Sequence, residues 1–544
     1  MNKKKIIKKE ERESIRIRQY ATLKKNLFIL GAVILAIGYI FFISFDFDKN
    51  KGEKKEPEIK EEVIAEKKPE YEPVEGGTLR LSVTRFSTVD PYKNKENSMD
   101  QFLRLVYDSL FKYDKNYNLM PELASGYNIS DNSKTLTIEM NPAARWQDGS
   151  KVTADDVAYT INKIKNSPGS PYNSLVSNIA STKVMGSSLE LQLAQPNSLE
   201  AYKLIFPILK KDTKGTGALL NDGEFGVVGN GMFVVSGYNK GKNITLKRNE
   251  NYHGKKPYIN EILVNIYSDE EIRKNMFMSS NVDIIDCSYY DLNKFDYDIF
   301  RASSYQSRQF DFITFNSGRA PFDQGMNRKA ISKIIDMKAA VEDAYRGKLQ
   351  LSLFPINNGS ELNIVNTVLF DKEQVKKTRL IAFEPRRLKI ITDKDDPMRH
   401  RMAYIIKDDL SKAGLDSDVE GMAGEDLKQA IEAGNFDIGI FSYQVPLNKD
   451  ISKLSKSNPQ FFNYDFTAIN QSMQDVYTAQ SKFERNQKYA NLQNKLFESM
   501  PYLGIGFRHD YKVYNNRIQG ELESTSVELY NGIENIFIVE EKQP

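Results

Sequence analysis

The stretch "RWQDGSKVTADDVAYTINKIK", Arg145–Lys165, holds the only tryptophan of the chain. Its "TADD" could bind a metal ion through two adjacent carboxylates, or it could begin a helix. Thr153 is followed three residues later by Asp156, which approximates a capping box, and acidic residues in a first turn stabilise the helix dipole. A metal would need further ligands, and no histidine or cysteine lies near. We therefore predict a helix start, with Trp146 in a hydrophobic core.

Segments on both sides of this stretch alternate between apolar and polar residues, which predicts β-strands. These segments are Thr78–Val83, Thr135–Met140, Ser188–Ala194, Ile244–Asn249 and Glu261–Tyr267. Helical spacing predicts an amphipathic helix over Met99–Tyr113 and another over Asn327–Tyr345. From Asn327 onward helices and strands alternate up to a strand at Phe436–Val445, a pattern typical of βαβ units and an α/β domain.

The composition bounds the class of protein. A chain of 544 residues with 40% hydrophobic and 27% charged residues is globular and is expected to fold as several domains. The net charge is +3, and it arises from the first 75 residues, so the body is close to neutral. A neutral body does not favour nucleic-acid binding, which needs a concentrated basic face. The single cysteine, Cys287, excludes an internal disulfide and is expected to be a buried strand residue.

The N-terminal part predicts a membrane anchor. Residues 27–45, "LFILGAVILAIGYIFFISF", carry no charge and match the length of a transmembrane helix. Residues 1–26 carry ten Lys/Arg against three Glu, which places them in the cytoplasm and the body outside it. A cleaved signal peptide is the alternative, but no small-residue cleavage site follows. Residues 46–76, rich in charge and proline, are expected to be a disordered tether.

Several segments resemble extracellular solute-binding protein family 5, which includes the peptide- and nickel-binding proteins of ABC importers. "PELASGYNISDNSKTLTIEMNPAARWQDGSKVTADDVAYTI" (Pro121–Ile161) resembles the signature of the family, and "VGNGMFVVSGYNKGKNITLKRNENYHGKKPYINEI" (Val228–Ile262) resembles its glycine turn and "RNxxY" segment. "FNSGRAPFDQGMNRKAISKIID", "FDIGIFSYQ" and "YANLQNKLFESMPYLGIGF" follow in the expected order. The resemblance covers about residues 77–540, nearly all of the body.

The resemblance implies a bilobed α/β fold of the periplasmic-binding-protein type (type II, the large form with three subdomains), preceded here by one transmembrane helix. It implies that the lobes close on a ligand between them like a hinge. Lobe I is expected to consist of residues 77–110, 228–310 and 516–544. Its subsidiary domain is expected at 111–227. Lobe II is expected at 311–515.

In peptide-binding members the ligand is extended and pairs with strands of both lobes, which supplies affinity without sequence preference. By position in the family, the predicted ligand-binding residues of lobe I are Thr84, Arg85, Phe86 and Tyr172. Those of lobe II are Phe441, Ser442, Tyr443, Gln444 and Val445. Phe86, Phe441 and Tyr443 are equally compatible with ordinary packing, and Arg85 with a surface position.

The sequence departs from the peptide binders after the strand at 436–445. In those proteins an aspartate at this place pairs with the amino terminus of the peptide, whereas here Pro446 occupies it and Asp450 is the next acid. Nickel is disfavoured because the three histidines are scattered, at His253, His400 and His509. We expect no catalytic residue, metal or cofactor.

The leading hypothesis is a monomeric, membrane-tethered solute receptor that delivers a peptide or another small solute to ABC permease subunits. The second keeps the fold but makes the chain a sensor or an assembly partner with altered or lost ligand binding. An enzyme is the weakest, because the chain has no G-x-S-x-G, H-E-x-x-H or P-loop motif. "GVVGNG", Gly226–Gly231, lacks phosphate-loop spacing and is expected to be a turn.

Overall fold

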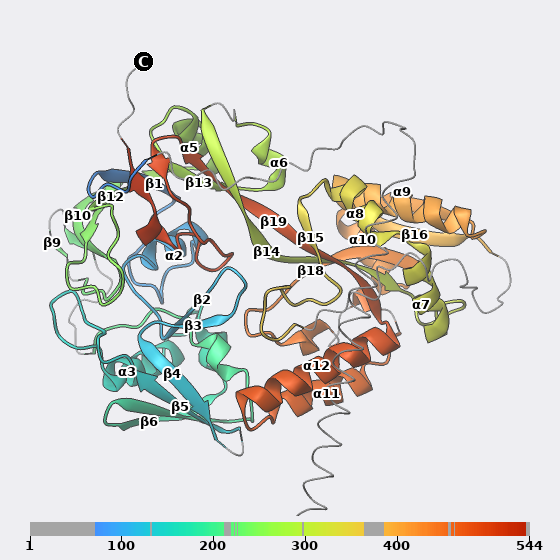
Figure 1. Ribbon diagram of the computed structural model, residues 1–544, viewed down its shortest axis with the longest axis horizontal. Helices are drawn as coiled ribbons and strands as arrows, with labels where there is room; N and C mark the ends of the chain where they lie inside the picture. Colours follow the sequence, from blue (N-terminus) through green and yellow to red (C-terminus); the bar gives the residue numbers. More distant parts are fainter. Residues whose placement is uncertain are drawn as a thin grey trace, which may run out of the picture. The chain divides into compact units, whose positions relative to one another are not determined.

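The computed structural model (Figure 1) divides the chain into residues 1–68 and 69–544, and every residue it describes lies in the second unit. The described residues are 71–130, 133–211, 219–221, 224–225, 227–295, 299–363, 386–454, 459–461 and 463–539. Among them no helix has the length and apolar character needed to cross a bilayer. The predicted anchor at 27–45 and nearly all of the tether lie outside the described residues.

The sheet of lobe I has four strands in the order β1, β12, β11 and β10. Their bounds are Thr78–Thr84, Glu261–Tyr267, Asn243–Arg248 and Phe233–Asn239. β1 is an edge strand and runs parallel to β12 in continuous register from Thr78, opposite Glu261, to Thr84, opposite Tyr267. The helices α2 (Asn97–Leu103) and α5 (Glu270–Met278) belong to this part. The predicted strands therefore form, with their predicted positions nearly unchanged.

The predicted helix over Met99–Tyr113 is wrong beyond its first turns. α2 ends at Leu103, and residues 111–113 form β2 (Phe111–Tyr113), which pairs with β3 (Leu119–Pro121). The backbone carbonyls of Leu105 and Val106 accept hydrogen bonds from Phe233, at 2.9 Å, and from Gly231, at 2.9 Å. A Cβ on Gly231 would overlap the Leu105 carbonyl oxygen, so the backbones approach closely at this glycine. The described part of the predicted glycine turn, 227–231, forms this close approach and not a hydrogen-bonded turn. These long-range bonds replace the next helical turn.

The subsidiary domain is a four-stranded antiparallel sheet in the order β4, β5, β7 and β6. The strands span Ala124–Ile129, Thr135–Met140, Ser188–Leu193 and Ile179–Met185, and the helices α3 and α4 span Ala154–Lys165 and Asn173–Val176. The helix start at "TADD" is confirmed: the Thr153 hydroxyl accepts from the Asp156 amide, and Asp156 accepts from the Thr153 amide at 2.8 Å. Trp146 is 0% exposed and donates to the same Asp156 carboxylate, so its core position is confirmed too.

A seven-stranded sheet connects lobe I to lobe II, with strand order β13, β19, β14, β18, β16 and β17, and with β15 beside β19. Their bounds are Ile284–Cys287, Tyr502–Asn515, Phe300–Phe315, Ile438–Gln444, Leu388–Asp393, Ser417–Met422 and Leu349–Leu351. β16, β17 and β18 are joined by α9 (Pro397–Lys412) and α10 (Gly424–Glu432), and β16 is parallel to both neighbours, which confirms the predicted α/β units. Cys287 is buried in β13, as predicted.

The long strands β14 and β19 run from the part that contains β1 and β13 into the part that contains β16 and α9 (Figure 1). The predicted lobe boundaries at 310/311 and 515/516 fall within β14 and at the end of β19. The helix predicted over 327–345 is wrong, because two helices form, α7 (Gly325–Ile334) and α8 (Met337–Tyr345). Asp336 ends the first by capping the second, where its carboxylate accepts from the Ala339 amide.

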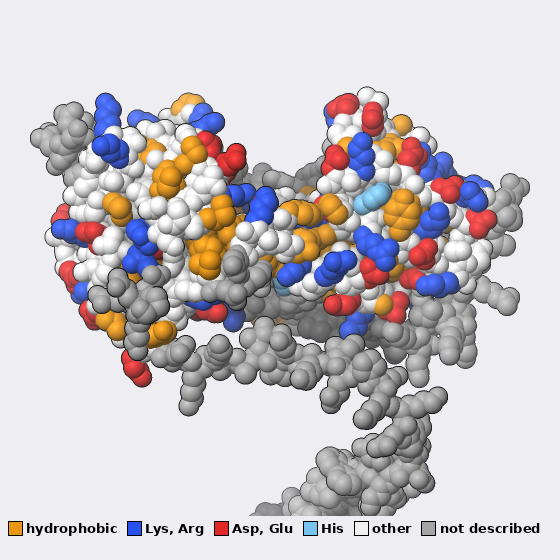
Figure 2. All heavy atoms as spheres, turned by 90° about the horizontal axis from the view of Figure 1, so that it is seen from above, with side chains coloured by type: hydrophobic (Ala, Val, Ile, Leu, Met, Phe, Trp, Pro, Cys, Tyr) orange, Lys and Arg blue, Asp and Glu red, His pale blue; other side chains and the backbone are white. Residues whose placement is uncertain are grey.

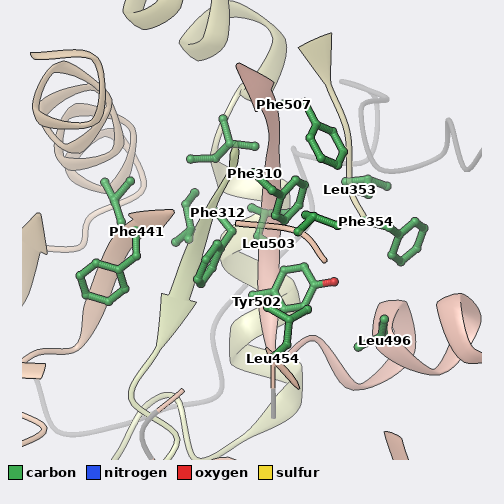
Figure 3. Packing of buried hydrophobic residues seen from close by; sticks show 14 of the residues in the cluster. Phe310, Phe312, Leu353, Phe354, Phe441, Leu454, Leu496, Tyr502, Leu503 and Phe507 are labelled. Carbon is green, nitrogen blue, oxygen red and sulfur yellow. The ribbon is translucent and has the colours of Figure 1, made fainter. Parts of the chain in front are cut away.

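The hydrophobic core of lobe II surrounds β14 and β19. Figure 3 shows Phe310 and Phe312 of β14 beside Tyr502 and Leu503 of β19, with Phe441 on the neighbouring strand β18. The core also takes in Tyr113, Tyr117 and Tyr202 from the predicted subsidiary domain. The remaining elements are α6 (Tyr289–Leu292), α11 (Thr467–Tyr477), α12 (Lys482–Ser499), β8 (Leu219–Asn221), β9 (Glu224–Phe225), β20 (Ile518–Gln519), β21 (Phe537–Ile538), η1 (Glu200–Lys203), η4 (Ile451–Leu454), η5 (Pro459–Phe461) and η6 (Ile533–Asn535).

Candidate ligand-binding site

The end of β18 offers an unpaired backbone edge. On one side β18 pairs with β14 along its whole length, from Ile438 to Gln444. On the other side it pairs with β16 only from Ile438 to Ile440. Among the described residues no strand covers this second side of 441–444. An open strand edge can accept an extended peptide by main-chain hydrogen bonds, and it lies at the carboxyl end of a parallel strand, where α/β folds bind ligands.

The predicted lobe II residues differ in how available their side chains are. Phe441 is buried, with its ring 6.0 Å from that of Phe436, and Val445 is also buried. Tyr443 is half-buried, and burial raises its pKa to about 12. Gln444 is exposed and Ser442 is intermediate. The structure thus places the backbone of the segment at an open edge while it packs Phe441 and Val445 inward.

The predicted residues Thr84–Phe86 lie at the end of β1, where the strand gives way to irregular chain. The Thr84 amide donates to the hydroxyl of Ser98, and the exposed Arg85 has a left-handed φ of 62°. Phe86 is half-buried, and its ring centroid lies 5.4 Å from that of Tyr238. A non-glycine residue with positive φ is uncommon, so the backbone at Arg85 is strained, and β1 ends immediately before it.

Tyr172 lies in the core of the predicted lobe I. Its hydroxyl donates to Asp100 of α2, and its ring packs edge-on against Tyr92 at 5.7 Å. Burial raises its pKa well above the ordinary range. No hydrogen bond or ring contact recorded between described residues joins Tyr172 or Thr84–Phe86 to Phe441–Val445.

The loop that follows β18 contains a buried lysine that the sequence reasoning did not single out. Lys449 is 3% exposed and has a left-handed φ of 57°. Its ammonium lies 5.1 Å above the ring of Tyr117 and 5.8 Å above the ring of Tyr113. Burial lowers the pKa of Lys449 to about 7. No sequence signal could have found it, because its burial depends on contact with the distant β2–β3 hairpin.

The carboxylate of Asp450, the acid nearest to the position of Pro446, is hydrogen-bonded to a neighbouring residue of its own loop. Its carboxylate accepts from the amide of Ser452 at 3.0 Å and from the hydroxyl of Ser452 at 2.6 Å. This arrangement is an Asx-type turn that begins η4. The alternative that Asp450 replaces the missing aspartate therefore finds no support in its geometry.

Polar contacts join α6 of lobe I to lobe II. Arg508 of β19 donates to Asp311 at 2.8 Å and pairs with Asp396 at 2.7 Å. It also donates to the hydroxyl of Tyr290 at 3.3 Å. Asp311 is fully buried, and burial raises its pKa despite the facing guanidinium. Tyr290 contributes to this network from α6, which the predicted boundaries place in lobe I.

Figure 2 shows a face of the described body that is hollowed between two raised parts, with hydrophobic side chains on its floor. A polar cavity of about 690 Å³ lies beside the connecting strands β14 and β19. It is lined by Lys115, Asn116, Ser303, Ser304, Tyr305, Gln306, Leu349, Gln350, His509, Glu521, Leu522, Glu523 and Ser524. None of the predicted site residues lines it. Within the described ranges, no group of three or more His, Cys, Asp or Glu side chains is placed to hold a metal ion.

The family assignment follows from a match over more than half of the chain. Residues 118–456 match the family described as bacterial extracellular solute-binding proteins, family 5 Middle, and the chain belongs to this family. Its members are solute-binding proteins.

Among the relatives, the chain is 21% identical over 460 residues to the probable D,D-dipeptide-binding periplasmic protein DdpA of Escherichia coli K12, covering 79% of this chain and 88% of the relative. It is 26% identical over 282 residues to the glutathione-binding protein GsiB of Salmonella typhi, covering 48% and 53%.

Solved structures show the fold. The unliganded open form of the periplasmic murein tripeptide binding protein MppA superposes with a TM-score of 0.70 at 16% identity, covering 86% of this chain and 99% of that one. The ABC transporter substrate-binding protein CtaP of Listeria monocytogenes superposes with a TM-score of 0.67 at 18% identity, covering 86% and 100%. The fold is therefore the mixed α/β, bilobed fold of solute-binding proteins.

Proposed function

We propose that this chain is a membrane-tethered, extracytoplasmic receptor that captures short peptides between its lobes and delivers them to an ABC permease. The observation that carries the proposal is the unpaired side of β18 at 441–444, which can pair with an extended ligand whatever its side chains. The names of the two relatives, a dipeptide- and a glutathione-binding protein, support a peptide-like ligand. The hydrophobic run at 27–45 supports the tether.

The full-length chain, purified in mild detergent, tests the binding claim by native mass spectrometry. We expect a co-purifying or added peptide whose mass disappears on partial unfolding. Deletion of the gene is expected to reduce uptake of the same peptide by intact cells. A chain that stays free of ligand with every peptide library, in cells whose peptide uptake is unchanged, would contradict the proposal.

The tether has its own test. A chain that lacks residues 27–45 should be released from the membrane fraction. In cells that carry the full-length chain, protease added outside should digest the body while the cells are intact. A body that protease reaches only after lysis would contradict the outside location.

A sensor or assembly role is the second candidate, and the packing of the inter-lobe contact favours it. Tyr113, Tyr117 and Tyr202 belong to the same hydrophobic core as lobe II, and the Tyr113 hydroxyl donates to the Leu447 carbonyl at 2.9 Å. A contact of this kind can hold the lobes together without a ligand. A partner protein retained after mild extraction, with peptide uptake unaffected by deletion, would decide for this role.

A further inference from the structure

The loop after β18 presents a buried lysine, Lys449, three residues beyond Pro446, which occupies the position where peptide binders of this family have an acid. Lys449 is 3% exposed, and its ammonium faces the rings of Tyr113 and Tyr117. Aromatic faces attract a cation, but they replace only part of the hydration that burial removes. Among the described residues, no carboxylate lies within ion-pair distance of this ammonium.

The two acids that act on the charge of Lys449, Asp114 and Glu361, form their hydrogen bonds and ion pairs with other residues. Asp114 accepts from the amides of Asn116, at 2.9 Å, and Asn118, at 2.8 Å, which closes the turn between β2 and β3. Glu361 pairs with Arg485 at 2.8 Å and accepts from the Tyr202 hydroxyl. Both carboxylates favour the charged form of Lys449 from a distance, but neither forms an ion pair with it.

A second cation lies at the same place. The Arg308 guanidinium, which comes from β14, donates to the Val445 carbonyl at 3.2 Å, on the β14 side of the chain just beyond β18. Its Nε is buried and has no hydrogen-bond partner. A buried polar atom without a hydrogen-bond partner is costly, so this Nε–H has capacity for one more acceptor. Arg308 and Lys449 thus place two cationic side chains near Val445, on the β14 side of the chain that follows β18.

We propose that the inter-lobe site takes peptides by an anionic end, a free carboxylate, which Lys449 and Arg308 bind just beyond the end of β18. The free amino terminus of the ligand then has no partner in this loop, since Pro446 replaces the family's aspartate and Asp450 is held by Ser452. Because Lys449 is enclosed, the carboxylate reaches it when the contact between this loop and the β2–β3 hairpin opens. This inference rests on the proposed peptide receptor function.

Four pools of synthetic tetrapeptides with the same composition test it on the full-length chain in mild detergent. The pools combine a free or acetylated amino terminus with a free or amidated carboxyl terminus, and binding is measured by titration calorimetry. We expect amidation to weaken binding tenfold or more and acetylation to change it less than twofold. Lys449→Met should weaken binding of the pools with a free carboxyl terminus about tenfold. It should also remove the difference in affinity between peptides with a free and with an amidated carboxyl terminus.

Lys428→Met is the matched control, because Lys428 is exposed on α10 and pairs only with Glu425, four-fifths of a turn away on the same helix. Lys449→Arg, which keeps the charge, should keep the carboxylate preference, and thermal unfolding of each variant checks that it is folded. Loss of binding on acetylation but not on amidation, or unchanged binding by Lys449→Met, would overturn the inference and leave the receptor function standing. Failure of all four pools to bind would overturn both.

Discussion

Lys449 should make the stability of the protein depend on pH. Burial lowers its folded-state pKa to about 7, while the ordinary value is 10.5. Between these values the unfolded chain holds a proton that the folded chain has released, so the free energy of unfolding rises with pH across this window. Below about pH 7 both states are protonated, so Lys449 no longer makes the free energy of unfolding depend on pH, and the full cost of burying its charge remains.

We compare the free energy of unfolding of the wild type with that of Lys449→Met. We expect the difference, wild type minus variant, to rise from pH 7 to pH 10 with a slope approaching about 1.4 kcal/mol per pH unit. Urea unfolding of both proteins at four pH values measures the difference, which removes the effect of every other titrating group. Parallel stability curves would mean that Lys449 stays charged in its buried position. The sequence could not have predicted this, since the tyrosines that enclose Lys449 lie more than 300 residues earlier.

At the scale of single elements, the capping box at the start of α3 contributes to the stability of the subsidiary domain. The Thr153 hydroxyl lies 2.8 Å from the Asp156 carboxylate, which also accepts the Thr153 amide. Loss of such a cap costs about 1 kcal/mol. We expect Thr153→Ala to lower the free energy of unfolding by this amount in urea titration, and Thr153→Ser, which keeps the hydroxyl, to restore most of it. Equal losses in both variants would place the contribution in the methyl group instead.

The connecting strand β19 depends on a glycine at its contact with β15. Gly506 has a φ of 151°, and a Cβ on it would overlap the carbonyl oxygen of Gln350. Overpacking against backbone costs about 1–3 kcal/mol, and strain of the φ angle adds to it. We expect Gly506→Ala to destabilise by about 3 kcal/mol in urea unfolding. Gly347→Ala is the control, because Gly347 has a φ of 73° with open space around it and should show the strain alone. Equal losses of the free energy of unfolding in both variants would mean that β15 shifts to make room for the added methyl group.

Elements set by local pattern were predictable, and those set by distant contacts were not. The strands at Thr135–Met140 and Glu261–Tyr267 were found at their predicted bounds because one face of each is buried and their side chains alternate. The helix over Met99–Tyr113 failed because Phe233 and Gly231, far along the chain, bind the carbonyls that it needs. The site shows the same limit: the position of β18 followed from its pattern, but its open edge depends on where β16 stops.

At the scale of the whole molecule, we expect Tyr290 to stabilise the closed form of the proposed receptor. Its hydroxyl accepts a hydrogen bond from Arg508, which also pairs with Asp396 at the start of α9. A hydrogen bond to a charged group contributes about 1.5–3 kcal/mol when buried, and less here because the Tyr290 side chain is 47% exposed. If closure follows the hinge motion implied for this family, loss of this bond should shift the population toward the open form by about 1 kcal/mol.

Single-molecule FRET on the full-length chain measures this shift. The native Cys287 is buried, so dyes can be directed to cysteines introduced at the exposed Lys240 of lobe I and Lys428 of lobe II. We expect Tyr290→Phe to populate longer distances and to bind the carboxylate peptide pools about fivefold more weakly. Tyr289→Phe is the control, since its ring contact with Lys348 survives loss of the hydroxyl. A distance distribution identical to wild type would mean that the Tyr290 bond does not limit closure, and that the tyrosine-rich contact at Tyr113 and Tyr117 holds the lobes instead.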